Sequence, residues 1–173
     1  MKIYRQALLS SLVIFLIASC KKVPDFPKSP EITYEGIKKT VGYEYLGPGA
    51  NGPLYNKIDS VVISLYFKDG DGDLGTTDTD TTFNNYFCEV LIKKDSTFVY
   101  LVDRDSKFSQ LNPDGRQGPI EGTLNFSPSL QLDSLFLGYT SPYTLKFKVS
   151  ILDNAGHRSN EIMTDTVQIQ LYD

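Results

Sequence analysis

The sequence predicts an all-β protein, an antiparallel β-sandwich of seven or eight strands that follows an N-terminal leader. From Glu31 onward, apolar and polar residues alternate with the period of two that is typical of half-buried strands. Gly, Pro, Asn and Asp separate these runs, and no stretch has a clear helical period. Eleven Tyr and ten Phe also favour strands. The length of 173 residues is enough for one domain with a sizeable core.

Residues 1–19 have the composition of a signal peptide. Lys2 and Arg5 make the start positive, and the apolar run that follows is too short to cross a bilayer as a helix. The stretch Ile17-Ala18-Ser19-Cys20 resembles the lipobox of bacterial lipoproteins. That resemblance implies cleavage before Cys20 and acylation of this cysteine, with palmitate among the expected chains. A plain secretory signal is the alternative.

Acylation would hold the protein to a membrane, because each buried CH₂ contributes about 0.8 kcal/mol. Cleavage would remove Lys2 and Arg5 and so change the formal net charge from −4 to −6. An acidic chain of this kind is not expected to bind nucleic acid or a membrane surface through its charge. Lys21 stands where an Asp retains some lipoproteins at the inner membrane. By that analogy we expect the cell envelope and its outer membrane, with the leaflet left open.

Residues 20–30 are predicted to form a tether between the lipid and the sandwich of 31–173. Pro24, Pro27 and Pro30 recur every three residues, which favours an extended polyproline II segment. At roughly 3.1 Å per residue, such a segment would span about 30 Å.

Most of the predicted strands have one apolar face. Cys88 is in phase with Val90 and Ile92, so we expect a buried core thiol; after Cys20 it is the only cysteine, which excludes an internal disulfide. A break is expected at 47–53, and 127–138 is either a strand or a helical turn. The predicted strands lie around 41–45, 61–68, 87–93, 97–102, 120–126, 143–152 and 164–171.

Two motifs in this pattern resemble a known family. The second predicted strand runs into Asp69-Gly70-Asp71-Gly72-Asp73-Leu74-Gly75, and a late hairpin carries Asp153-Asn154-Ala155-Gly156-His157-Arg158-Ser159-Asn160-Glu161. Together they resemble small immunoglobulin-like lipoproteins of Bacteroidota, although His157 stands where Asn is usual. The resemblance covers most of 31–173. It implies an immunoglobulin-like fold and an envelope location, and many such proteins have no assigned activity.

The acidic loop predicts a calcium site. Asp69, Asp71 and Asp73 place three carboxylates at alternate positions, and hard oxygen ligands at this spacing suit Ca²⁺. Leu74 occupies the position where an EF-hand requires Gly, so the loop is of another kind. In an immunoglobulin-type sandwich this loop and the late hairpin lie at the same end. The alternative is a solvated acidic turn. The predicted ligands are Asp69, Asp71, Asp73 and a carbonyl near Gly75, with Asp153 or Asn154 nearby.

The sequence does not predict an enzyme. His157 is the only histidine, and neither a Gly-x-Ser-x-Gly elbow nor a phosphate-binding loop is present. We expect a non-catalytic binding module that contacts a glycan or an envelope protein through the loops 69–82, 153–160 or 103–117. The alternative is a structural or assembly subunit of an outer-membrane complex with no ligand of its own.

Overall fold

The computed structural model describes residues 23–76, 83–112, 114–130 and 142–170, without the side chains of 44, 46 and 54–58. These residues form strands, turns and loops and no helix, so none of them builds a helix that could cross a membrane. The predicted signal peptide, Cys20 and most of the ambiguous segment 127–138 lie outside the described residues.

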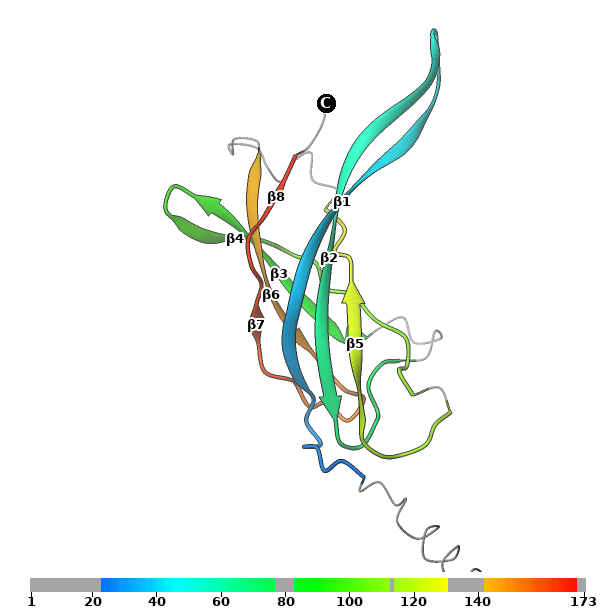
Figure 1. Cartoon of the computed structure of the whole chain (residues 1–173), viewed down its shortest axis with the longest axis vertical. Helices are drawn as coiled ribbons and strands as arrows, with labels where there is room; N and C mark the ends of the chain where they lie inside the picture. The colour runs from blue at the N-terminus through cyan, green and yellow to red at the C-terminus, as the bar shows by residue number, and fades with distance from the viewer. Residues whose placement is uncertain (1–22, 77–82, 113, 131–141, 171–173) are drawn as a thin grey trace, which may run out of the picture.

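The strands form two antiparallel sheets (Figure 1). The first contains three strands in the order β1-β2-β5, and the second contains five, in the order β4-β3-β6-β7 with β8 also paired to β6. The first sheet consists of β1 (Glu31–Gly49), β2 (Gly52–Asp69) and β5 (Ile120–Phe126). The second consists of β3 (Tyr86–Lys94), β4 (Thr97–Asp103), β6 (Tyr143–Ile151), β7 (Ile162–Met163) and β8 (Val167–Ile169).

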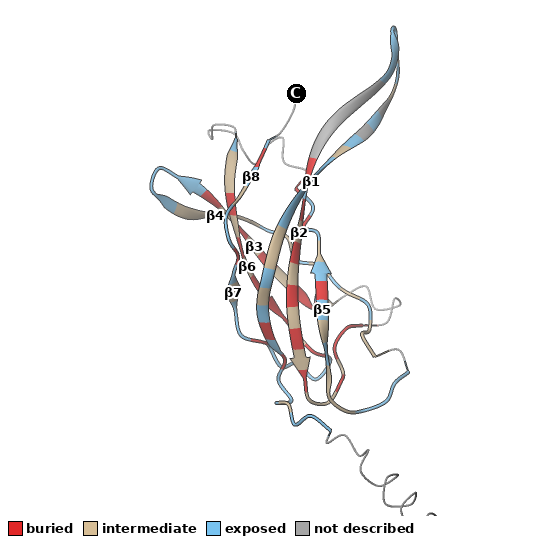
Figure 2. Cartoon of the chain, in the orientation of Figure 1, coloured by how far each residue is buried: buried red, intermediate tan, exposed pale blue. Residues whose placement is uncertain are grey.

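One apolar core lies between the sheets, as the alternation of buried residues along β2, β3 and β6 shows (Figure 2). The ring of Tyr86 from β3 stacks on Phe126 from β5 with 3.8 Å between ring centroids, which joins the two layers. Cys88 is fully buried in this core, as predicted. Each large apolar side chain buried in this way contributes about 1.5–3 kcal/mol. The predicted fold class, an all-β antiparallel sandwich, is confirmed.

The β1–β2 hairpin is longer than the sequence predicts. The expected break at 47–53 is wrong in extent, because only Ala50 and Asn51 form the turn and β2 begins at Gly52. The outer half of the hairpin extends beyond the sandwich (Figure 1). There, Val41, Tyr43 and Tyr45 are 48%, 70% and 57% exposed. A ribbon that packs on no core needs no alternating pattern, so the first part of β2 carries no strand signal.

The last predicted strand, 164–171, is also corrected: within its described residues the structure has only β8 (Val167–Ile169), and a separate short strand, β7, precedes it at Ile162–Met163. Thr164 lies between them. Its hydroxyl oxygen accepts a hydrogen bond from the Phe147 amide at 3.0 Å, and its own amide donates to the Phe147 carbonyl at 2.9 Å. A side-chain hydrogen bond thus replaces one backbone hydrogen bond between the strands, and this interrupts the strand.

Candidate metal centre

The acidic loop lies at one end of the sandwich, beside the connection between β6 and β7. Asp69 is the last residue of β2, and Asp153 follows the end of β6 by two positions. Leu74 and Asp153 form an isolated antiparallel bridge, and the Asn154 amide donates to the Asp73 carbonyl at 3.4 Å. The expectation that the two segments lie at the same end is therefore confirmed.

Four carboxylates meet in this loop. One oxygen from each of Asp69, Asp71, Asp73 and Asp153 lies within 4.8 Å of the others. Asp69 and Asp153 are fully buried, whereas Asp71 and Asp73 are half-buried. Like charges at such distances repel one another strongly when water is excluded. These oxygens could hold a metal ion.

The two carboxylate oxygens of Asp69 differ in their hydrogen bonds. Oδ2 accepts hydrogen bonds from the amides of Gly72 at 2.9 Å and Asp73 at 3.1 Å. Oδ1 is buried and has no hydrogen-bond partner within the described chain, and the same is true of one oxygen each of Asp71 and Asp73. A buried polar atom without a partner costs about 1–3 kcal/mol, and more when it is charged. The loop therefore fixes one oxygen with its own backbone and leaves another free to bind a cation.

The pKa values reflect the same crowding. Burial, followed by the charges of Asp71 and Asp73, raises the pKa of Asp69 to about 6, although two backbone amides oppose the shift. Burial, followed by the charges of Asp153 and Asp71, also raises the pKa of Asp73. A divalent cation among the carboxylates would offset these repulsions and favour their ionised forms.

His157 positions Asp153, a role that sequence reasoning missed. Its amide donates to Asp153 Oδ1 at 2.7 Å, and its ring Nδ1 lies 2.9 Å from Asp153 Oδ2. The Asp153 amide donates in return to the His157 carbonyl at 3.1 Å. The four-residue separation of the two residues in a Gly-containing turn is the signal that could have indicated this contact. The His157 ring is nevertheless 44% exposed.

The two remaining predicted ligands have different surroundings. Gly75 is buried with φ of +90°, and a Cβ there would lie 2.3 Å from the Ser109 carbonyl oxygen, so close packing already requires glycine. Its carbonyl as a ligand stays a prediction. Asn154 is exposed and its side chain lines a neighbouring cavity. Of the pair Asp153 and Asn154, Asp153 is the one whose carboxylate belongs to the cluster.

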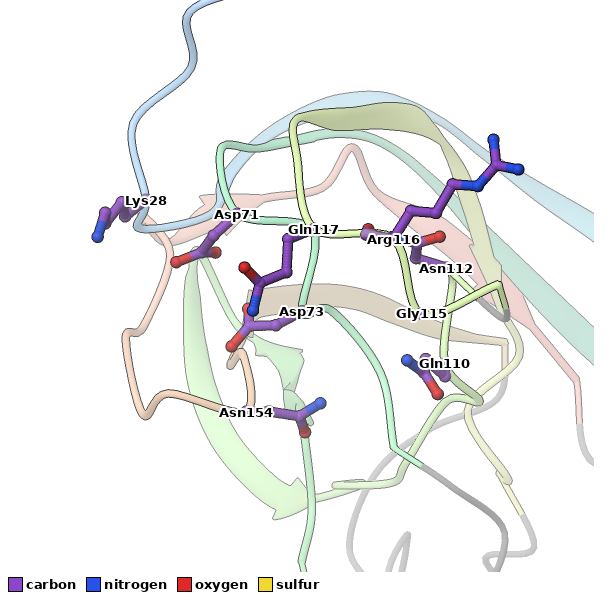
Figure 3. A pocket seen from close by; sticks show the side chains of 10 residues that line it. Lys28, Asp71, Asp73, Gln110, Asn112, Gly115, Arg116, Gln117 and Asn154 are labelled. Carbon is purple, nitrogen blue, oxygen red and sulfur yellow. The ribbon is translucent and has the colours of Figure 1, made fainter.

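A third loop, the polar segment before β5, completes this end of the sandwich. The Leu111 amide donates to the Leu74 carbonyl at 3.0 Å, and the Gly118 amide donates to the Asp71 carbonyl at 3.2 Å. Between this loop and the carboxylates lies a cavity of about 330 Å³ (Figure 3). Its lining consists of Lys28, Asp71, Gly72, Asp73, Gln110, Asn112, Gly115, Arg116, Gln117 and Asn154.

The last residues of the predicted tether pack against the acidic loop. A Cβ at Gly70 would lie 2.4 Å from the Phe26 carbonyl oxygen and 2.6 Å from that of Pro27. The Lys68 ammonium lies 5.4 Å from the centre of the Phe26 ring. Within the predicted tether, the residues from Phe26 onward thus lie on the sandwich, and only those before it could act as an extended spacer.

Comparison of the chain with protein-family models, with curated proteins and with solved structures gives no match.

Proposed function

We propose that the chain is a lipid-anchored lipoprotein of the cell envelope, held in the outer membrane through Cys20. Its sandwich serves as a non-catalytic binding module that Ca²⁺ stabilises. The observation that carries the calcium proposal is the set of buried oxygens on Asp69, Asp71 and Asp73 that have no hydrogen-bond partner among the described residues. The anchor and the location rest on the sequence around Cys20 and Lys21.

The strand order supports an immunoglobulin-like sandwich. In that fold the first, second and fifth core strands share one sheet, and the third and sixth pair in the other. Here β1, β2 and β5 form the first sheet, and β3 pairs with β6 in the second. β4 adds a strand beside β3, at the edge of the second sheet.

Calcium fits this donor set better than other common metals. The four side chains offer only carboxylate oxygens, whereas Zn²⁺ prefers nitrogen and sulfur ligands. Mg²⁺ usually keeps several waters and binds through one or two carboxylates. Ca²⁺ takes six to eight oxygens in a flexible geometry, so four carboxylates would supply at least half of its shell.

Thermal melting tests the calcium proposal. In millimolar Ca²⁺ we expect a melting temperature several degrees higher than in EDTA, since ion at 100 times Kd adds about 2.7 kcal/mol. The variant Asp71→Asn/Asp73→Asn should lose this rise. Because it also removes two repelling charges, it should melt higher than the wild type in EDTA. Asp95→Asn/Asp114→Asn changes the charge equally at exposed positions outside the cluster and should keep the full rise. Equal melts of the wild type in EDTA and Ca²⁺ would contradict the proposal.

The long hairpin favours a second candidate, an assembly subunit that contacts another envelope protein. Val41, Tyr43 and Tyr45 alternate along β1, so they share one face of the ribbon, and all three are exposed. Exposed Tyr residues of this kind are common in protein interfaces. If this candidate is right, Tyr43→Ser/Tyr45→Ser should abolish the recovery of a specific envelope protein after cross-linking, while the calcium response stays unchanged. Equal recovery with wild type and variant would exclude this face as the contact.

A further inference from the structure

We propose that the cavity beside the carboxylates binds a neutral glycan, whose hydroxyl groups complete the coordination of the calcium ion. This inference rests on the calcium site of the proposed function and adds the chemical class of its ligand. It begins from a buried carboxylate: Asp69 is fully buried, its Oδ1 has no hydrogen-bond partner among the described residues, and its carboxylate belongs to the same cluster as Asp71 and Asp73, which line the cavity.

The ion site and the cavity share a wall. Asp71 and Asp73 belong to the carboxylate cluster and also line the cavity. Asp69 and Asp153, the other two members, are fully buried. An ion held by all four would therefore be closed on the protein side and open toward the cavity. Since Ca²⁺ takes six to eight oxygens, about two to four positions remain for other ligands.

The lining suits hydroxyl groups. Four amide side chains surround the space, from Gln110, Asn112, Gln117 and Asn154. Each amide can both donate and accept, as a sugar hydroxyl also can. The lining residues are polar, charged or glycine, which disfavours an apolar ligand. The volume of about 330 Å³ is at the lower end of the range for small-ligand sites.

The balance of charge suits a neutral ligand. The four ionised carboxylates with one Ca²⁺ carry two negative charges, and Lys28 and Arg116 in the cavity lining supply two positive charges, so the site with its ion has no net charge to attract an acidic or a basic ligand. The guanidinium of Arg116 points away from Asp71 and Asp73 (Figure 3). The amide of Gln117 instead points toward them, where it could meet a hydroxyl held by the ion (Figure 3).

Binding to an array of neutral and acidic oligosaccharides tests the inference. The full chain is purified in a detergent without a sugar headgroup and applied in millimolar Ca²⁺ or in EDTA. We expect saturable binding to neutral oligosaccharides in Ca²⁺ that EDTA abolishes. Gln110→Ala/Gln117→Ala should weaken this binding about tenfold or more, since it removes two hydrogen-bonding side chains. Gln168→Ala, at an exposed position on β8, should bind as the wild type does.

The calcium response separates this inference from the proposed function. The Gln110→Ala/Gln117→Ala variant should keep the full rise of the melting temperature in Ca²⁺, whereas Asp71→Asn/Asp73→Asn should lose both that rise and the binding. If the wild type shows the rise but binds no oligosaccharide, the glycan inference fails and the calcium site stands. Binding only to acidic oligosaccharides, or binding unchanged by EDTA, would also overturn the inference. If Ca²⁺ does not raise the melting temperature of the wild type, both the proposed calcium site and the glycan inference fail.

Discussion

Asp69 has two carboxylate oxygens in different surroundings. Oδ2 accepts two amide hydrogen bonds from the loop, and these bonds hold the backbone of Gly72 and Asp73 in place. Oδ1 is buried in the same loop without a partner within the described chain. The first arrangement explains the shape of the loop, and the second makes the folded protein less stable when the carboxylate is ionised and no cation is bound.

The stability of the ion-free protein should therefore fall as the pH rises. The pKa of Asp69 is raised from an ordinary 3.8 to about 6, so the folded state binds the proton more tightly than the unfolded state does. The resulting stability is present below about pH 4 and is lost as the pH passes through about 6. In EDTA we expect a lower melting temperature at about pH 7 than at about pH 5.

Two controls accompany this measurement. Asp69→Asn has no carboxylate to titrate and should show a smaller fall. In Ca²⁺ the trend should reverse, because protons compete with the ion at low pH. A melting temperature in EDTA that rises between about pH 5 and pH 7 would contradict the prediction.

Tyr86 offers a second prediction at this scale. Its hydroxyl is fully buried and has no hydrogen-bond partner among the residues described, and burial raises its pKa. We expect Tyr86→Phe to melt at the same or a higher temperature, since it removes a buried polar group and keeps the ring on Phe126. Tyr86→Ala should cost about 3–5 kcal/mol in the free energy of unfolding. A clear loss of stability in Tyr86→Phe would show that the hydroxyl has a stabilising partner.

At the scale of elements, the β1–β2 hairpin has two parts. Its inner part pairs with β5 and carries core residues such as Ile63 and Leu65. The outer part pairs only within the hairpin, in the register Gly42 to Ile58 and Tyr43 to Lys57. A ribbon of two strands alone is marginally stable in water, so the outer part depends on the inner part.

Shortening the hairpin should leave the sandwich intact. If residues 43–57 are replaced by Asn-Gly between Gly42 and Ile58, we expect a melting temperature within a few degrees of the wild type and an unchanged calcium response. Asp59→Ala, at the base of the outer hairpin, is the contrasting variant and should destabilise the protein. Asp59 Oδ2 accepts hydrogen bonds from the Gln170 amide at 2.8 Å and from Lys39 Nζ at 3.3 Å. The variant should lose about 1–3 kcal/mol. A large loss in the shortened chain would mean that the outer ribbon supports the core.

Local patterns predicted the fold class and most of the carboxylate cluster. Asp69, Asp71 and Asp73 lie within five consecutive residues, so the sequence alone predicted that their carboxylates would be close. The expected sandwich topology placed Asp153 at the same end. The cavity was not predicted, because the loop before β5 is joined to Asp71 and Leu74 by backbone hydrogen bonds between distant segments. Gly72 and Gly75 are required where this loop comes close, but a glycine does not indicate which segment packs against it. The hairpin length was missed for another reason, since the first part of β2 packs on no core and carries no alternating apolar pattern.

At the scale of the whole molecule, the two ends of the sandwich carry different features. The carboxylates, the cavity and the last residues of the predicted tether lie at one end, and the hairpin extends from the other (Figure 1). The formal net charge is −4, and the proposed cleavage would make it −6, so charge gives the protein no attraction to an anionic membrane. The proposed membrane attachment should therefore depend on the lipid alone.

Replacement of Cys20, the proposed site of acylation, tests that dependence. In a bacterial host that processes lipoproteins, the wild type should incorporate a labelled fatty acid and sediment with the membranes, whereas Cys20→Ser should do neither. Cys88→Ser is the matched control and should behave as the wild type, because the buried Cys88 thiol is no acceptor for lipid. Sedimentation of Cys20→Ser with the membranes would show that another contact holds the protein there.

The packing of Phe26 and Pro27 on Gly70 would also orient the proposed lipid-anchored molecule relative to its membrane. A domain held by lipid at Cys20 would have at most a few residues of free chain before that contact, so its reach from the bilayer would be short. The acidic end would then face the lipid headgroups, and the ribbon tip would be the most distant point of the protein (Figure 1). Ligands of the cavity would have to approach along the membrane, while partners of the tip could approach from across the compartment.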